Sequence, residues 1–246
     1  MLEIKDLSAG YARRTVITDI NATFKKGSLI SIIGPNGSGK STLLKAITGI
    51  IPAMSGDVFL DSVPIMELTQ KQRAQKIAYL PQGKNTPDMT VERLVLHGRF
   101  PHISYPRHYT PRDREIALDA MKKTGVDCFT ERPLLELSGG MRQNAYIAMA
   151  LAQDTDFILL DEPTTYLDIK NQLELIKNLK NLTDSGKGII SVMHDLPLAL
   201  SFSDEIIVIN EGRIAKHGTP QAIYDSGVIK DVFKIELNPD FSYKLK

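Results

Sequence analysis

Short runs of apolar residues with little polar interruption recur along this chain. They read SLISII at 28–33, FILL at 157–160 and IISVM at 189–193. A strand that is covered on both faces of a parallel sheet loses the alternation of apolar and polar positions and becomes such a run. A shorter run, Ile77–Leu80, has the same character. Segments with helical spacing separate these runs, so the pattern predicts an α/β fold built on a parallel sheet.

The N-terminal segment instead alternates apolar with polar residues. Leu2 and Ile4 form one such stretch, and Ile20, Ala22 and Phe24 form another. Alternation with a period of two predicts half-buried strands, so we expect an antiparallel start before the first buried run. The expected connections are a turn at 8–11, a loop at 49–56, a hairpin within 57–65 around Asp61 and Ser62, and a hairpin within 206–214.

The middle of the chain, about 83–153, lacks clear strands. A helix is expected at 91–96, and a second is expected to begin at Thr110. Threonine is a good N-cap, Pro111 is tolerated in a first helical turn, and Asp113 would lie near the positive end of the helix dipole. This segment therefore predicts a helical subdomain inserted into the α/β domain.

The last third of the chain returns to alternating strands and helices. A helix with Ile169, Leu173 and Ile176 on one face is expected after the second buried run. Thr219 is expected to begin the last helix. The C-terminal tail, about 225–246, carries no motif, so we expect one domain over 1–246.

Composition is that of an ordinary globular protein, with 42% hydrophobic and 24% charged residues among 246. A chain of this length can bury a sizeable core without disulfides, and its only cysteine, Cys128, excludes an intrachain disulfide. The formal net charge of +1 gives no global field that would favour nucleic acid or an anionic membrane. No signal-peptide pattern begins the chain, and no apolar run reaches the roughly 18–20 residues that span a bilayer. Any role at a membrane is therefore expected to be that of a peripheral subunit.

The first buried run leads into a glycine-rich loop that matches the phosphate-binding pattern G-x-x-x-x-G-K-[ST] at every defined position. Glycines let backbone N–H groups approach phosphate oxygens, and the following helix adds unpaired donors at its N-terminus. Lys40 would reach the β- and γ-phosphates, and Ser41 would bind Mg²⁺. The alternative, a glycine-rich turn that only begins a helix, fits the complete pattern poorly. The loop consists of Gly34, Pro35, Asn36, Gly37, Ser38, Gly39, Lys40 and Ser41.

Polar residues follow the other predicted strands directly. Because ligands bind at the carboxyl ends of parallel strands, we expect these residues to share one site with the loop. Asp161 is expected to hold Mg²⁺, and Glu162 to orient or deprotonate the attacking water. His194 is expected near the γ-phosphate, and Gln82 near the metal or the water. Taken alone, the acidic pair is also typical of a surface turn or of an N-cap before the next helix. A lone His194 would be interpreted first as a hydrogen-bonded histidine at a strand end.

A second glycine motif precedes an apolar helix expected at 145–151. Ser138, Gly139 and Gly140 would leave backbone N–H groups free at the start of that helix, which suits an anion. The alternative is a plain serine N-cap followed by flexible glycines. The chain would then have two sites suited to an anion but only one lysine-bearing loop. A head-to-tail dimer accounts for this, because the Ser138 loop of one subunit would close over the nucleotide that the other subunit binds.

Together these motifs resemble the ATP-binding subunit of an ABC transporter over about residues 1–224. The resemblance identifies Gln82 with the Q-loop, 137–140 with the signature, 157–162 with Walker B, Asp168 with the D-loop and His194 with the switch histidine. It also implies that Tyr11 stacks on adenine and that Thr42 and Asp168 contact the nucleotide. The implied fold is a P-loop NTPase core of ABC type with an antiparallel β subdomain and an inserted helical subdomain.

The resemblance further implies a Mg²⁺-dependent ATPase that works as a homodimer with two ATP molecules between its subunits. It implies transmembrane permease partners at the cytoplasmic face of the membrane, and indirectly an extracytoplasmic binding protein. The stretches 78–82, 97–102 and 161–169 are similar to importers of iron–siderophore complexes, haem and cobalamin. Two departures are Met141, where the family usually has glutamine, and Asn144, where it usually has arginine.

Other functions remain open at this level. A soluble ABC ATPase that serves as a conformational partner in iron–sulfur cluster assembly also has one ATP-binding domain. A nucleic-acid or ribosome remodeller usually carries two such domains or a basic insertion, which this chain lacks. His97, His102 and His108 match no tight metal-ligand spacing, so the Pro- and aromatic-rich loop 98–109 is expected to contact a permease rather than a metal.

Overall fold

The computed structural model describes residues 1–12, 14–83, 86–106, 108–165 and 167–244. Its centre is a six-stranded sheet of order β10-β9-β3-β8-β7-β6, in which all neighbours are parallel except β10 and β9. A second, antiparallel sheet has the order β2-β1-β4-β5. The strands of the central sheet are β3 (Leu29–Ile33), β6 (Ile77–Leu80), β7 (Phe157–Asp161), β8 (Gly188–Val192), β9 (Glu205–Asn210) and β10 (Arg213–Gly218).

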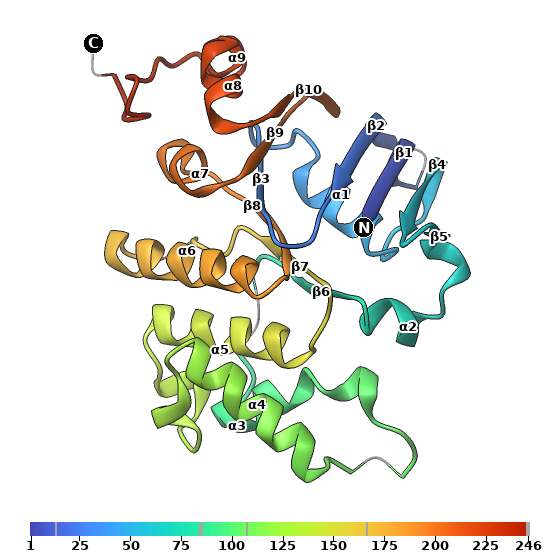
Figure 1. Ribbon diagram of the computed structural model, residues 1–246, viewed down its shortest axis with the longest axis vertical. Helices are drawn as coiled ribbons and strands as arrows, with labels where there is room; N and C mark the ends of the chain where they lie inside the picture. The colour runs from blue at the N-terminus through green and yellow to red at the C-terminus, as the bar shows by residue number, and fades with distance from the viewer. Residues whose placement is uncertain (13, 84–85, 107, 166, 245–246) are drawn as a thin grey trace.

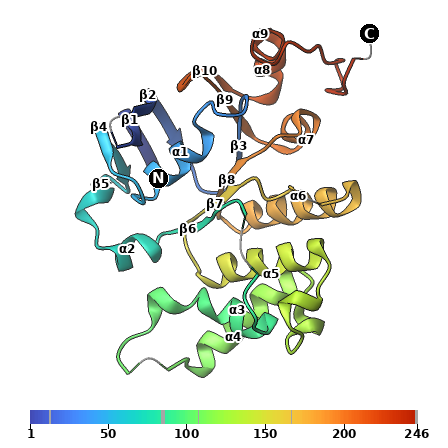
Figure 2. The same cartoon turned by 180° about the vertical axis from the view of Figure 1, so that it is seen from behind.

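All residues of β3, β7 and β8 are buried, as the apolar runs predict. Successive side chains of β3 enter two different clusters. Leu29 and Ile33 belong to the cluster that includes the long helices, whereas Ile30 and Ile32 belong to the cluster that includes helix α1 (Lys40–Ile47) and the antiparallel sheet. Figures 1 and 2 show this arrangement, with α1 and the antiparallel sheet on one side of the central sheet. Helices α6 (Ile169–Asp184) and α7 (Leu196–Phe202) lie on the other side.

The antiparallel sheet confirms the alternating N-terminal pattern but corrects two connections. Its strands are β1 (Leu2–Tyr11), β2 (Arg14–Phe24), β4 (Ala53–Leu60) and β5 (Val63–Pro64). The expected turn at 8–11 is wrong, because β1 continues through it and Gly10 pairs with Thr15. A Cβ added to Gly10 would lie 2.0 Å from the Arg14 carbonyl oxygen, so this glycine permits close strand pairing rather than a turn. The expected loop at 49–56 is likewise too long, because β4 begins at Ala53.

Three helices form a separate layer at the bottom of Figure 1. They are α3 (Val91–His97), α4 (Pro111–Lys123) and α5 (Gly139–Ala152), and each contacts the other two. Helix α4 begins after Thr110, as predicted, and Asp113 completes a capping box with it. Helix α5 begins directly after Ser138, six residues before the predicted start, so the glycine motif forms its first turn.

A buried ion pair connects this helical layer. Arg99 Nε donates to Asp113 Oδ1 at 2.9 Å, and Arg99 Nη1 donates to the Ala152 carbonyl oxygen at 2.7 Å. The Arg99 and Asp113 residues are only 6% and 8% exposed. The pair therefore ties the segment after α3 to the first turn of α4 and to the last turn of α5.

The remaining helices are α2 (Gln70–Ala74), α6 (Ile169–Asp184), α7 (Leu196–Phe202), α8 (Pro220–Asp225) and α9 (Val228–Phe233). Of the three residues expected on one face of α6, Ile176 is buried, whereas Ile169 is 76% exposed. Leu175, Ile176 and Leu179 belong to the buried face. Helix α8 begins after Thr219 as predicted, but α9 follows it inside the segment expected as a tail. Single-turn 3₁₀ helices lie at Ile65–Glu67, Phe100–His102, Asp127–Phe129 and Leu134–Glu136.

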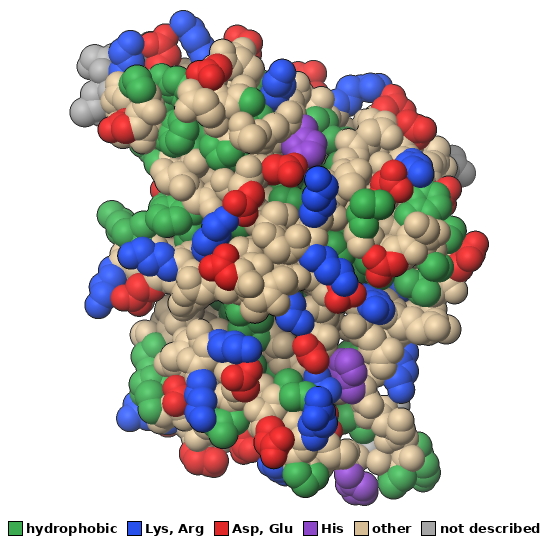
Figure 3. Space-filling view, in the orientation of Figure 1, with side chains coloured by type: hydrophobic (Ala, Val, Ile, Leu, Met, Phe, Trp, Pro, Cys, Tyr) green, Lys and Arg blue, Asp and Glu red, His purple; other side chains and the backbone are tan. Residues whose placement is uncertain are grey.

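Lysine and arginine side chains are interspersed with acidic ones on the face drawn in Figure 3. Across the described ranges, no helix combines the length and apolarity that crossing a membrane requires. Among the described residues, no group of three or more His, Cys, Asp or Glu side chains is arranged to hold a metal ion. Arg107, in the expected contact loop, and Tyr166, in the stretch 161–169, lie outside the described residues.

Candidate functional site

The glycine-rich loop lies between β3 and α1 and takes backbone conformations that its glycines make accessible. Gly37 has a φ of 77° and Gly39 a φ of 104°. Gly39 is the N-cap of α1 and provides no side-chain cap, so the first N–H groups of the helix have no side-chain acceptor there. A Cβ at Gly34 would lie 2.2 Å from the Ile209 carbonyl oxygen. The loop thus has the open helix N-terminus that an anion requires.

Lys40 points back across the loop. Its Nζ donates to the carbonyl oxygens of Gly34 and Pro35 at 2.8 and 2.9 Å. Burial lowers the pKa of the Lys40 ammonium, and the nearby carboxylates of Glu162 and Asp161 offset part of that effect. Since the ammonium is held by neutral carbonyl groups, a phosphate group in the loop would be a stronger partner for it.

Ser41 and Asp161 meet at the start of α1. The Ser41 hydroxyl donates to Asp161 Oδ1 at 2.9 Å. Asp161 is 4% exposed, and this burial raises the pKa of its carboxyl group. The hydrogen bonds from Ser41 and Tyr79 lower that pKa in part. A hydroxyl and a carboxylate are oxygen ligands of the kind that Mg²⁺ prefers, and Mg²⁺ commonly needs only one or two such protein ligands beside phosphate oxygens and water. This donor set therefore fits Mg²⁺.

Glu162 follows β7 and is contacted by residues that follow β6 and β8 and by a residue of its own segment. Gln82 Nε2 donates to its Oε2, and Thr165 Oγ1 lies 3.3 Å from the same oxygen. His194 Nε2, just beyond β8, is 2.5 Å from Glu162 Oε1. Glu162 itself has a φ of 53°, in the left-handed region. The carboxylate is thereby fixed in front of the loop by residues from three separate segments.

One cavity of about 610 Å³ joins these groups. Its volume is within the range of small-molecule sites. It opens at the carboxyl ends of β3, β6, β7 and β8, as the polar strand ends predict. Its lining residues are Val16, Asn36, Gly37, Gly39, Lys40, Ser41, Thr42, Gln82, Glu162 and His194.

The second glycine motif lies outside this cavity. Ser138 is the N-cap of α5, and its hydroxyl accepts from the Met141 N–H at 3.3 Å. Ser138 and Gly139 are exposed, whereas Gly140 is packed so closely that an added Cβ would lie 3.0 Å from the Asn171 side chain. Asp168 is the N-cap of α6 and accepts from the Asn171 backbone N–H at 2.8 Å. Within one chain, therefore, neither Ser138 nor Asp168 reaches the glycine-rich loop.

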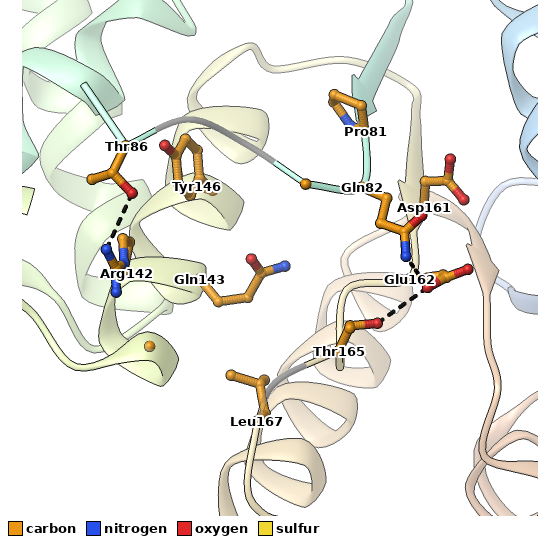
Figure 4. Close-up of a pocket in the computed structure, with 12 residues that line it drawn as sticks. Pro81, Gln82, Thr86, Arg142, Gln143, Tyr146, Asp161, Glu162, Thr165 and Leu167 are labelled. Carbon is orange, nitrogen blue, oxygen red and sulfur yellow. Dashed lines mark hydrogen bonds between the residues drawn. The ribbon is translucent and has the colours of Figure 1, made fainter.

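A second cavity of about 340 Å³ separates α5 from the carboxyl ends of β6 and β7. Figure 4 shows Gln82 and Glu162 on one side of it and Arg142 on the other. Arg142 Nη1 donates to Thr86 Oγ1 at 3.1 Å, which links the first turn of α5 to the segment after Gln82. Because Gln82 and Glu162 line both cavities, the space between α5 and the strand ends continues from the cavity at the glycine-rich loop.

Tyr11 lies at the end of β1, 46% exposed, and is not among the residues that line the larger cavity. Lys45 Nζ lies 5.7 Å from the centre of its ring and 3.4 Å from its hydroxyl. Since Lys45 belongs to α1, this contact holds the Tyr11 ring beside that helix.

Sequence reasoning missed three residues of the site. Thr165 contacts Glu162, Val16 lines the cavity from β2, and the Tyr79 hydroxyl donates to Asp161 Oδ2 at 3.2 Å. Of these three, only Tyr79 could have been recognised from the sequence, because its hydroxyl is a polar group in an otherwise apolar strand that leads to Gln82. Two histidines of the middle segment contact other groups. His102 Nε2 lies 2.8 Å from the Gln153 carbonyl oxygen, and the His97 ring packs on Phe100.

Comparison with known proteins gives the same picture. A family model described as ABC transporter matches residues 17–165. This chain belongs to the ABC transporter family. The petrobactin import ATP-binding protein FpuD of Bacillus anthracis is 41% identical over 237 residues, which cover 96% of this chain and 87% of FpuD. The iron(3+)-hydroxamate import ATP-binding protein FhuC of Bacillus subtilis is also 41% identical, over 96% of this chain and 88% of its own.

Among solved structures, the ATP-binding cassette MJ0796, a dimer in a post-hydrolysis state with ADP and Pi, superposes with a TM-score of 0.77. It is 29% identical and covers 89% of this chain and 99% of its own. The predicted family, the ABC-type α/β fold and the ATPase activity coupled to transport are thereby confirmed.

Proposed function

We propose that this chain is the ATP-hydrolysing subunit of an importer for an iron–siderophore complex. The observation that carries the proposal is one cavity lined by the glycine-rich loop, Ser41 and Glu162, with Asp161 hydrogen-bonded to Ser41 at its side. Relatives that match nearly the whole chain are named for petrobactin and iron(3+)-hydroxamate import, which favours a siderophore over haem or cobalamin as cargo.

In the proposed reaction, Lys40 and the N–H groups of the loop bind the phosphates of ATP. Ser41 and Asp161 hold Mg²⁺, with the Gln82 amide oxygen as a further ligand. The ion would neutralise charge that develops on the transferred phosphoryl group. Glu162 accepts a proton from the attacking water, and His194 positions that water against the γ-phosphate. Catalysis then consists of positioning and charge stabilisation.

We further propose a head-to-tail homodimer in which Ser138, Gly139, Gly140 and Asp168 of one subunit complete the nucleotide site of the other. Ser138, Gly139 and Asp168 are exposed and do not line the cavity of their own chain, which supports this arrangement, as does the dimeric state of MJ0796. Tyr11 would stack on the base. Met141 donates to Ser138 through its backbone N–H, so methionine preserves this turn in place of glutamine.

The proposed partners are transmembrane permease subunits, which would hold the dimer at the cytoplasmic face of the membrane. An extracytoplasmic binding protein would deliver the cargo to the permease. Phe100, Pro101 and Ile103, beside α2, belong to the loop expected to contact the permease, and they line a groove on the surface.

The test is to purify the tagged protein in mild detergent from its own membranes and to identify by mass spectrometry what accompanies it. We expect a polytopic permease subunit, and loss of iron–siderophore uptake when the gene is deleted. Uptake should return with the unsubstituted gene but not with Glu162→Gln. Recovery of only a soluble iron–sulfur assembly partner, with uptake intact in the deletion strain, would overturn the importer while leaving the ATPase.

A further inference from the structure

Both carboxylate oxygens of Asp161 accept a hydrogen bond, each from a different element. Oδ1 accepts from the Ser41 hydroxyl of α1 at 2.9 Å, and Oδ2 accepts from the Tyr79 hydroxyl of β6 at 3.2 Å. We propose that Tyr79 is a positioning residue for the metal site: it fixes the rotation of the Asp161 carboxylate so that Oδ1 faces Ser41 and the ion. This inference rests on the Mg²⁺ site of the proposed function.

The strand register explains why Tyr79 reaches this carboxylate. β6 and β7 are parallel, and Tyr79 lies opposite Leu159. Because side chains two residues apart share a face, Leu159 and Asp161 lie on the same side of β7 as Tyr79 does on β6. Ile77, Phe157 and Leu159 on this side belong to the apolar cluster that contains α1, and Tyr79 packs against it. The Tyr79 hydroxyl is therefore brought to the edge of an apolar layer at the point where Asp161 begins the site.

A carboxylate with one fixed oxygen can still rotate, whereas two donors from separate elements restrain it. Asp161 is 4% exposed, so solvent contributes little to holding it. Groups that hold a metal ligand from behind typically change metal affinity or activity by about 10–100-fold when they are removed. The competing explanation is that a half-buried tyrosine simply needs an acceptor for its hydroxyl. The two explanations differ in one respect: only the first makes the response to Mg²⁺ depend on that hydroxyl.

The experiment compares Tyr79→Phe with Tyr224→Phe. Each substitution removes one hydroxyl and keeps the ring, and the Tyr224 hydroxyl donates to the Leu237 carbonyl oxygen at 3.4 Å, in the C-terminal segment. Each purified protein is titrated with Mg²⁺ at saturating ATP, and ATP binding is measured separately in EDTA. For Tyr79→Phe we expect a roughly tenfold rise in the Mg²⁺ concentration that gives half-maximal hydrolysis. ATP binding in EDTA should stay within about twofold of the unsubstituted value, and Tyr224→Phe should change neither quantity.

Tyr79→His is a second test, because its imidazole again provides a hydrogen-bond donor at this position of β6. Its Mg²⁺ response should lie closer to that of the unsubstituted protein than the response of Tyr79→Phe does. An unchanged Mg²⁺ response in Tyr79→Phe overturns the proposal. Failure of Tyr79→Phe to fold also overturns it, because Phe keeps the packed ring and the result would show that the hydroxyl serves the fold. If the unsubstituted protein shows no dependence on Mg²⁺ at all, the proposed metal site itself is wrong, and that result is distinct from the failure of Tyr79.

Discussion

Replacing Asp113 by asparagine should expose how much the helical layer depends on its buried ion pair. Burial alone would raise the pKa of Asp113, but hydrogen bonds from Thr110 and Arg99 and the Arg99 charge outweigh it and lower the pKa to about 2. A fall from 3.8 to about 2 corresponds to about 2 kcal/mol of stability. The substitution also leaves Arg99, whose side chain is 7% exposed, without its counter-charge. We therefore expect a loss of about 2–4 kcal/mol in the free energy of unfolding at pH 7.

The pH dependence carries the sharper test. Because the pKa of Asp113 is depressed in the folded state, its contribution is present above the unfolded pKa and is lost as pH falls through the folded pKa. The difference in stability between the unsubstituted protein and Asp113→Asn should stay constant above about pH 5 and fall to roughly half near pH 3.

Urea unfolding followed by circular dichroism measures this difference, since the chain has no tryptophan. The matched control is Asp119→Asn on the same helix. Its ion pair with Lys123 is exposed and should be worth at most about 0.5 kcal/mol. Equal losses in the two variants, or a difference that stays the same from pH 7 to pH 3, would refute the reasoning.

Three further substitutions test the nucleotide site. Glu162→Gln should still bind ATP but hydrolyse it at least about 10²-fold more slowly, and near-normal turnover would exclude Glu162 as general base. Lys40→Ala should lose ATP binding in equilibrium dialysis, whereas unchanged affinity would argue against the role assigned to the loop. Gly34→Ala should weaken ATP binding as well as lower the thermal midpoint, because its Cβ would lie 2.2 Å from the Ile209 carbonyl oxygen. Normal binding by Gly34→Ala would show that the loop tolerates a shift there.

Much of the site could be predicted because its chemistry is local in sequence. The glycine loop needs glycines, a lysine and a hydroxyl at set positions, and the buried runs mark the strands that end at Asp161 and His194. The predictions failed where one local sequence pattern is compatible with two structures. Gly10 reads as a turn residue but serves close strand pairing, and Ile169 has helical spacing but lies in the first turn of α6, beyond the reach of the core.

By itself, the sequence determined the ABC-type α/β class, the phosphate loop and the polar residues at the strand ends. Tertiary structure alone decided which of these residues meet. The order β3-β8-β7-β6 brings Tyr79 to Asp161 and both Gln82 and His194 to Glu162, and it depends on pairing between segments far apart in the chain. Likewise, Arg99 joins Asp113 and Ala152 only because three helices pack together. Such contacts leave no pattern along the chain, because apolar strands of similar length can pair in several orders and only packing of the whole selects one.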